Sequence, residues 1–310
     1  MATYRILSLD GGGIRGLLTV VLLQRISAAL GSDSWLMKTD LAAGTSTGGL
    51  IALGFAKGLS LAELRSLYED DGDEIFDDSW FDNITDIGKL AGAEYDGGNL
   101  QRILKAKLGE TTRLQDLGKR VLIPSFDLDN EDANPRKRRW KPKLFHNFPG
   151  SDSDGAELAY KVGMRTAAAP TYFPSYEGYV DGGVFANNPA MCALAQVQNR
   201  AWPERPDLDE VVMLSIGTGT SLVYIEGQTK DWGYAQWAQP LVEVMFEGVS
   251  DVARYQCEQL MGGNFLRLAP TFGPGETFPL DDIEKIGDLV LFAESVKLEE
   301  TVDWLRNVWL

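Results

Sequence analysis

The first 44 residues alternate between strand-like and helix-like apolar runs, and this alternation restricts the fold more than any other feature. Tyr4–Leu9 has the composition of a strand, and the run from Leu17 to Leu30 is apolar nearly all round, which predicts a buried helix. A second strand is predicted to end at Gly44. A buried helix between two strands is typical of parallel strands joined by a crossover.

The same alternation continues along the chain. Further strands are predicted at 121–127, 143–146 and 211–216, and helices at 47–56, 60–68, 155–169, 189–200, 238–261 and 281–308. This order predicts an α/β fold with a mainly parallel central sheet flanked by helices on both faces. Two segments interrupt it, because residues 70–98 are acidic and glycine-rich and residues 129–142 begin acidic and end basic. Both are interpreted as surface insertions, so a single domain over residues 1–310 is the simpler organisation.

The net charge and the cysteine content of the chain restrict its possible binding partners and its cellular compartment. The formal net charge of −16 at pH 7 disfavours a nucleic acid polymer as a partner. The chain does not open with a basic region and a long apolar stretch, so no signal peptide is predicted, and the run Leu17–Leu23 is too short to span a bilayer. Cys192 and Cys257 do not make a disulfide framework, and a cytoplasmic location is expected.

The sharpest local motif is G-T-S-T-G at residues 44–48, between a predicted strand and an apolar helix. A serine on a tight turn of this kind is lifted above the sheet at a helix N-terminus, which favours developing negative charge. Side chains two residues to either side would clash, which accounts for Gly44 and Gly48. The motif therefore indicates a nucleophile at Ser46, and a serine that only caps the helix is the alternative.

A second glycine-rich motif, D-G-G-G-I-R-G at residues 10–16, follows the first strand and opens the first helix. Consecutive glycines let backbone N–H groups converge on an anion, as in an oxyanion hole or a phosphate cradle. Gly11, Gly13 and Gly16 also satisfy the dinucleotide-binding pattern G-x-G-x-x-G. That alternative needs an acidic residue at the end of the next strand, and Asp33 and Asp40 lie in roughly the right window.

A nucleophilic serine needs a base, and the chain has one histidine, His146. No glycine or turn motif presents this residue, which favours a structural role over a place in a triad. The other candidate is Asp181, because Gly182 and Gly183 follow it and predict a tight loop. A partly desolvated carboxylate can take a serine proton directly. From this motif alone, an Asp-Gly turn without function is the favoured interpretation.

Three motifs therefore occur in a fixed order, D-G-G-G-x-R-G, G-T-S-T-G and D-G-G. In this order they resemble the patatin-like phospholipase family, which includes plant patatins and is similar to the catalytic module of cytosolic phospholipase A enzymes. The resemblance covers roughly residues 3–220, with supporting blocks at 165–173, 181–189 and 214–219. Residues 221–310 are interpreted as a helical C-terminal extension packed on this core.

The resemblance implies a three-layer fold related to the α/β-hydrolases and a serine acyl hydrolase activity. Ser46 would attack an ester carbonyl, and Asp181 would accept its proton without a histidine. The implied site contains the nucleophile Ser46, the base Asp181, the oxyanion-hole residues Gly11, Gly12 and Gly13, and the supporting residues Arg15, Gly44, Gly48, Gly182 and Gly183. No cofactor and no metal is implied.

The implied substrates are acyl esters of membrane lipids, which would require peripheral association with membranes. The basic run Arg136–Lys143 and the aromatic stretch 232–246 are the two candidates for the membrane contact. A cyclic-nucleotide-activated phospholipase of bacterial antiphage defence, with a small-molecule activator, stays open as an alternative. An NAD(P)-binding enzyme and a non-catalytic interaction module also stay open.

Overall fold

The computed structural model describes residues 3–75, 98–170, 174–222, 224, 233, 237, 240–280 and 282–310. Most of the insertion predicted at 70–98 lies outside these described residues. So do Trp232 and Tyr234 of the aromatic stretch, whereas Trp237 and Phe246 are described.

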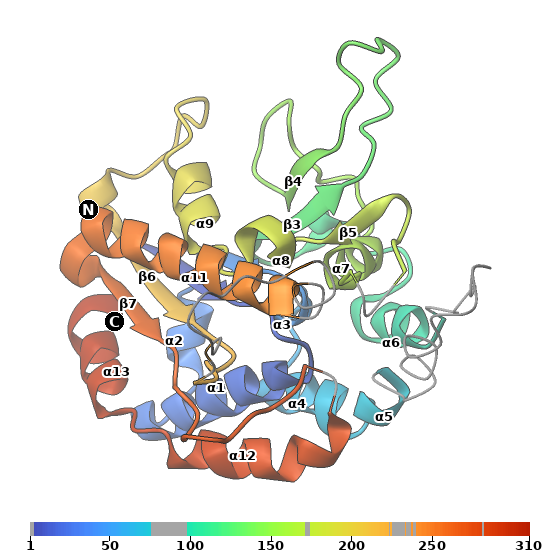
Figure 1. Ribbon diagram of the computed structural model, residues 1–310. Coiled ribbons are helices and arrows are strands. Elements are labelled where there is room, and N and C mark those ends of the chain that lie inside the picture. The colour runs from blue at the N-terminus through green and yellow to red at the C-terminus, as the bar shows by residue number, and fades with distance from the viewer. Residues whose placement is uncertain are drawn as a thin grey trace.

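Seven strands of the described residues form one mixed sheet in the order β4-β3-β2-β1-β6-β7, and β5 pairs with β3 (Figure 1). They are β1 (Tyr4–Leu9), β2 (Leu41–Gly44), β3 (Arg120–Asp127), β4 (Lys141–His146), β5 (Tyr179–Asp181), β6 (Val211–Ile216) and β7 (Phe265–Leu268). β1, β2, β3, β6 and β7 are parallel, and β4 and β5 run antiparallel to β3. The predicted mainly parallel sheet is confirmed.

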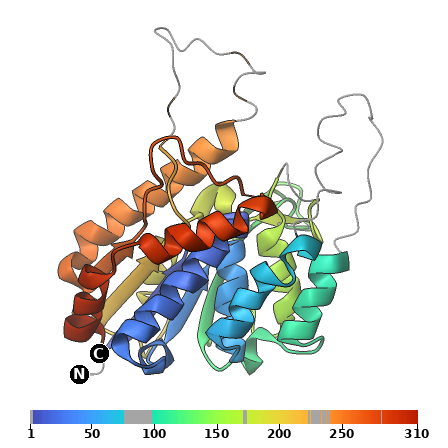
Figure 2. The same cartoon turned by 90° about the horizontal axis from the view of Figure 1, so that it is seen from below.

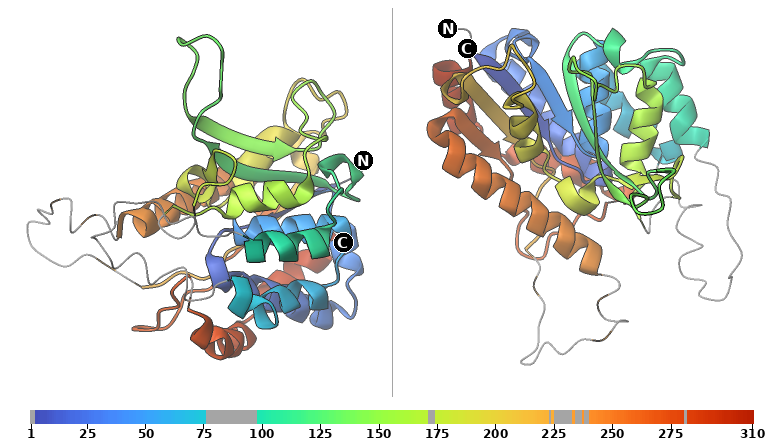
Figure 3. Two further views of the ribbon diagram at one scale, coloured as in Figure 1. Left: turned by 90° about the vertical axis from the view of Figure 1, so that its right-hand side faces the viewer. Right: turned by 90° about the horizontal axis from the view of Figure 1, so that it is seen from above.

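Helices cover both faces of this sheet (Figures 2 and 3). One face carries α1 (Gly16–Leu30), α3 (Thr47–Lys57), α4 (Leu61–Glu69), α6 (Gly98–Leu108), α7 (Ala159–Ala167) and, outside α1, α12 (Ile286–Ser295). The other face carries α9 (Ala190–Val197) and α11 (Pro240–Met261). Shorter described helices are α2 (Ser34–Met37), α5 (Gly72–Ile75), α8 (Gly183–Ala186) and α13 (Glu299–Trp304).

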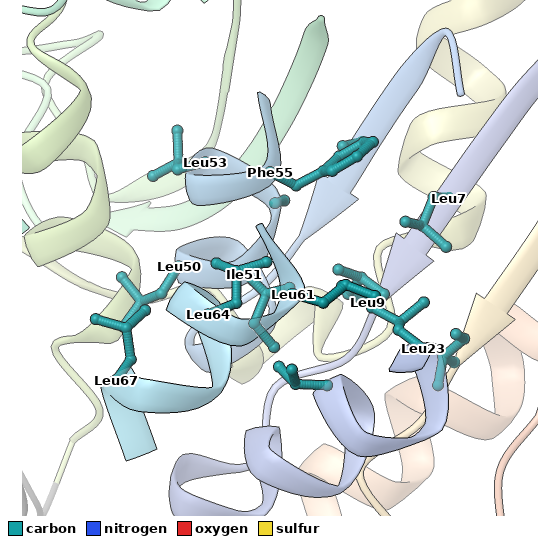
Figure 4. Packing of buried hydrophobic residues seen from close by; sticks show 14 of the residues in the cluster. Leu7, Leu9, Leu23, Leu50, Ile51, Leu53, Phe55, Leu61, Leu64 and Leu67 are labelled. Carbon is teal, nitrogen blue, oxygen red and sulfur yellow. The ribbon is translucent and has the colours of Figure 1, made fainter. Parts of the chain in front are cut away.

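Alternate side chains of β1 enter two apolar layers on opposite faces of the sheet. Leu7 and Leu9 join the larger layer with Leu50 and Ile51 of α3 (Figure 4), whereas Ile6 joins the smaller layer. The window from Gly13 to Leu30 is long and apolar enough to cross a membrane, but 61% of it is buried inside the fold. α1 is therefore a core helix here, as its all-round apolar sequence predicts.

Two strands share one edge of β3, and this arrangement brings the ends of β2 and β5 together. β2 pairs with the beginning of β3, with Ala43 opposite Leu122, and β5 pairs with the end of β3, with Asp181 opposite Ser125. β4 occupies the opposite edge of β3. Because β5 runs antiparallel, toward the end of β2, Asp181 lies beside the turn that follows Gly44.

The prediction of a single helix over residues 281–308 is wrong, because the described chain forms two helices there, α12 and α13. Nη1 of Arg25, on α1, donates hydrogen bonds to the carbonyls of Ala293 at 2.6 Å and Val296 at 2.8 Å. A side chain thus satisfies the carbonyl of Ala293 near the end of α12 and the carbonyl of the C-cap residue Val296. The helices predicted at 155–169 and 189–200 are shorter than predicted and correspond to α7 and α9.

Candidate active site

Ser46 occupies a strained turn between β2 and α3. Its backbone angles are φ 54° and ψ −127°, in a region that residues other than glycine rarely adopt. It stands at the N-cap position of α3, but its side chain makes no capping hydrogen bond. The Ser46 side chain therefore does not cap the helix. Backbone strain of this kind is typical of a turn that presents a nucleophile.

The glycines on either side of Ser46 are required by backbone contacts. A Cβ built on Gly44 would lie 2.1 Å from the carbonyl oxygen of Gly48. A Cβ on Gly48 would lie 2.3 Å from the carbonyl oxygen of Leu9 and 2.5 Å from that of Asp10. The turn therefore packs backbone to backbone against the end of β1, and the crowding expected at the two glycines is present.

Buried hydrogen bonds hold the serine turn in place. The N–H of Ser46 donates to Oγ1 of Thr166 at 2.9 Å, and that hydroxyl donates to the carbonyl of Pro124 at 2.6 Å. The hydroxyl of Thr45 donates to the carbonyl of Ala186 at 2.6 Å. Thr166 lies on α7 and Ala186 on α8, so the turn is tied to elements far away in sequence.

Asp181, at the end of β5, is fully buried. Its Oδ1 accepts a hydrogen bond from the N–H of Gly183 at 2.7 Å. Among the described residues, its Oδ2 has no hydrogen bond of regular geometry. Burial raises the pKa of Asp181 to about 7, while a side-chain contact with the Ser46 hydroxyl and the Gly183 bond oppose the rise. The predicted nucleophile and the predicted base therefore lie in contact with each other.

The two glycines after Asp181 also follow from close packing. A Cβ on Gly182 would lie 2.4 Å from the carbonyl oxygen of Pro124 in β3. A Cβ on Gly183 would lie 2.9 Å from the Phe246 ring of α11 and 3.1 Å from Oδ1 of Asp181. Only glycine lets this turn close under α11 and direct a backbone N–H at the carboxylate.

The glycine loop lies against the serine turn. A Cβ on Gly11 would lie 3.3 Å from Cβ of Ser46, so the Gly11 backbone is next to the nucleophile. The N–H of Gly11 already donates to the carbonyl of Asn187 at 3.0 Å. Among the described residues, no protein acceptor takes a hydrogen bond from the N–H of Gly12 or Gly13. These two groups are therefore available to an anion.

A buried ion pair, which the sequence motifs did not reveal, fixes the start of the glycine loop. Arg267 of β7 holds both carboxylate oxygens of Asp10, at 2.8 and 2.5 Å, and donates to the Ser215 hydroxyl at 2.8 Å. Burial raises the pKa of Asp10, and the bidentate contact with the Arg267 guanidinium opposes this rise. Arg15 lies further along the loop, where its Nη1 donates to the carbonyl of Gly219 at 3.4 Å.

His146 lies away from this site. It is the last residue of β4 and pairs with Leu122, on the edge of β3 opposite β2 and β5. Its Nε2 is 3.8 Å from a carboxylate oxygen of Asp152, and its ring packs edge-on against Phe148. Burial lowers its pKa. The histidine is therefore part of the sheet edge, as its lack of a turn motif predicts.

The dinucleotide-binding alternative lacks its acidic residue. β2 ends at Gly44, and the next residues are Thr45 and Ser46. Asp40 precedes β2, where its carboxylate accepts the N–H of Arg5 at 2.8 Å. No carboxylate follows β2 in the position where a ribose would need one.

Comparison with known proteins assigns the chain to a family. A family model described as patatin-like phospholipase matches residues 7–194, more than half of the chain. The chain belongs to the patatin-like phospholipase family. Protein teg of Priestia megaterium is 28% identical to this patatin-like chain, and the alignment covers 100% of both proteins. The cGAMP-activated phospholipase of Pseudomonas aeruginosa is 28% identical over 92% of this chain and 83% of that protein.

A solved structure, VipD from Legionella pneumophila, matches 94% of this patatin-like chain and 67% of its own, with 13% identity and a TM-score of 0.41.

Within the present chain, the matched family segment ends at residue 194. Phe246, Arg267 and Leu280 lie beyond it, and each contacts a predicted site element. Leu280 accepts the N–H of Ile14 on its carbonyl at 2.8 Å, beside Gly13.

Proposed function

We propose that this patatin-like chain is a serine lipid acyl hydrolase in which Ser46 is the nucleophile and Asp181 its base. The observation that carries the proposal is a serine with φ 54° in contact with a fully buried carboxyl whose pKa is raised to about 7. A base with a pKa near the working pH is ionised and still basic enough to accept a proton.

In the proposed first step, Oγ of Ser46 forms a bond to the ester carbonyl carbon while its proton moves to Asp181. The N–H groups of Gly12 and Gly13 stabilise the resulting oxyanion, and Gly11 keeps the loop in place through its bond to Asn187. Asp181 then gives the proton to the departing alcohol oxygen, and the acyl group stays on Ser46. Water then loses a proton to Asp181 and attacks the acyl carbon. The bond from this carbon to Oγ of Ser46 breaks, Asp181 returns the proton to Oγ, and the fatty acid is released.

The proposed substrates are acyl esters of glycerophospholipids, lysophospholipids or galactolipids, with the whole chain acting as one catalytic domain. Contacts of Phe246, Arg267 and Leu280 with the predicted site support this single unit. A cytoplasmic location with peripheral association at membranes remains part of the proposal. For the membrane contact, the exposed basic loop offers Arg136, Lys137 and Arg139, while Arg138 pairs with a neighbouring aspartate.

Labelling and turnover of three variants test the dyad. A fluorophosphonate probe should label wild type but not Ser46→Ala, and Asp181→Asn should lose nearly all hydrolysis of a short-chain ester with its fold intact. His146→Ala is the matched control for loss of a buried titratable group and should keep most of the activity. Labelling that survives Ser46→Ala, or a His146→Ala enzyme as inactive as Asp181→Asn, would refute the dyad.

A second candidate is the same activity under the control of a small-molecule activator. The relative named a cGAMP-activated phospholipase, which aligns with 92% of this chain, is the observation that favours it. Hydrolysis of phospholipid vesicles would be measured with and without cGAMP at micromolar concentration. A tenfold or greater increase supports the regulated form, and equal rates on an active enzyme support constitutive activity.

A further inference from the structure

A cavity of about 700 Å³ lies beside the candidate active site, on the side of α11 and β7. α11 forms one wall, and the chain segment 277–280 forms another. The ends of β6 and β7 close it from below, through residues such as Gly217 and Ala269. Its volume is within the range of roughly 300–1,000 Å³ that is typical of small-molecule sites.

The cavity begins one residue away from the nucleophile. Asn187 lines it, and Oδ1 of Asn187 would lie 2.3 Å from a Cβ built on Gly11, the same Cβ that would lie 3.3 Å from Cβ of Ser46. The Asn187 carboxamide and the Ser46 side chain therefore both lie next to Gly11. Asn187 is nine-tenths buried, and its Oδ1 has no hydrogen-bond partner among the described residues.

The walls of the cavity are suited to a hydrocarbon chain. Val244 and Phe246 line it from α11, and Phe278, Pro279 and Leu280 line it from the opposite segment. The strongest charges at its floor, Asp10 and Arg267, neutralise each other through their bidentate contact. Arg15, Glu243 and Glu247 also line the cavity, so a hydrocarbon chain would lie out of water along the apolar side chains of α11 and of segment 277–280 rather than against these charged groups.

The mouth of the cavity is bordered by apolar side chains that are exposed. Val244 belongs to the wall and the rim, and Leu241 and Met245 lie next to it on α11. Leu222 and Tyr224, after β6, are also exposed, and Tyr224 lines the cavity. Glu243 and Glu247 of α11 are exposed and line the cavity too, so the rim is mixed, and its apolar part is where a chain would pass from a lipid surface into the protein.

We propose that this cavity binds the acyl chain of the lipid substrate, and that the rim on α11 is where the chain enters from the lipid surface. The inference rests on the proposed acyl hydrolase function and adds the position of the chain to it. With the ester carbonyl between Ser46 and the N–H groups of Gly12 and Gly13, the chain passes Asn187 into the cavity.

Filling the cavity tests this inference through chain-length selectivity. Ala269→Trp places an indole at the floor, and Val244→Trp places one at the mouth. Val252→Trp is the matched control, because Val252 is exposed on the same helix and does not line the cavity. For each variant, kcat/KM would be measured with p-nitrophenyl butyrate and p-nitrophenyl palmitate, together with the rate of Ser46 labelling by a fluorophosphonate.

The expected result is a loss of at least tenfold on palmitate for both filling variants, with butyrate turnover and labelling within about twofold of wild type. The control should match wild type on both esters. Equal losses on the two esters, or undiminished palmitate turnover in Val244→Trp with its fold intact, would overturn the acyl-chain assignment. A wild type that is neither labelled nor active on either ester would instead refute the proposed function.

Discussion

Replacing Asp181 with asparagine should stabilise the folded protein at alkaline pH while it removes activity. The carboxyl is fully buried, and burial raises its pKa from 3.8 to about 7. Above pH 7 the folded protein must therefore hold a negative charge that the unfolded chain would keep in water. Asparagine has the same shape, can still accept the Gly183 N–H through Oδ1, and carries no charge.

The sign and size of the effect follow from linkage. Because the folded pKa is above the unfolded one, the native state binds the extra proton between pH 4 and 7, and its free energy of unfolding falls as pH rises. A shift from 3.8 to about 7 corresponds to a loss of about 4 kcal/mol, at 1.36 kcal/mol for each pH unit. About 2 kcal/mol of this loss occurs between pH 5.5 and 8.5. The other buried titratable groups are the same in wild type and variant, so their contributions cancel in the comparison.

Urea unfolding of wild type and Asp181→Asn at pH 5.5 and 8.5 measures the difference. The advantage of the variant should grow by about 2 kcal/mol from the lower to the higher pH. The exposed Asp303→Asn removes the same charge from the surface and should show no such growth. A constant offset between wild type and Asp181→Asn at both pH values would refute a carboxylate held at an energetic disadvantage.

Three further predictions concern the pH profile, the loop and the turn. The kcat/KM of the wild type should rise with pH through about 7, because Asp181 must be ionised to accept a proton, and a profile flat from pH 5 to 9 would contradict this. Arg267→Lys should lower kcat about tenfold or more with KM little changed, since one ammonium cannot hold both oxygens of Asp10. Gly48→Ala should lower the free energy of unfolding by about 1–3 kcal/mol, whereas Gly287→Ala, which has open space around it, should not.

The parts of the structure that depend on local patterns were predictable from the sequence. β1 and β6 have their predicted bounds, and β2 ends at Gly44 as predicted. Crowding at Gly44 also follows from the motif alone, because it arises against Gly48 within the same turn. These features are decided by backbone geometry and short-range sterics, which a short stretch of sequence contains.

Features that depend on long-range partners could not be predicted in the same way. β5 has three residues and pairs with β3 more than fifty positions earlier, so no periodicity marks it as a strand. Arg267 contacts Asp10 across 257 positions, and a lone arginine in the C-terminal segment carries no motif. The commitment of the Gly11 N–H to Asn187 likewise depends on how the two loops pack.

Two buried carboxyl groups, Asp10 and Asp181, lie close to Ser46. Burial raises the pKa of both, but the groups beside them differ. Asp10 receives a guanidinium on both oxygens, so its charge is compensated and it can only hold the loop. Asp181 receives one backbone N–H and no cation, so its charge stays uncompensated and its basicity stays high. A cation placed beside Asp181 would stabilise the protein and weaken the base. The absence of a hydrogen-bonded or paired cation there, among the described residues, therefore supports a dyad that works without histidine.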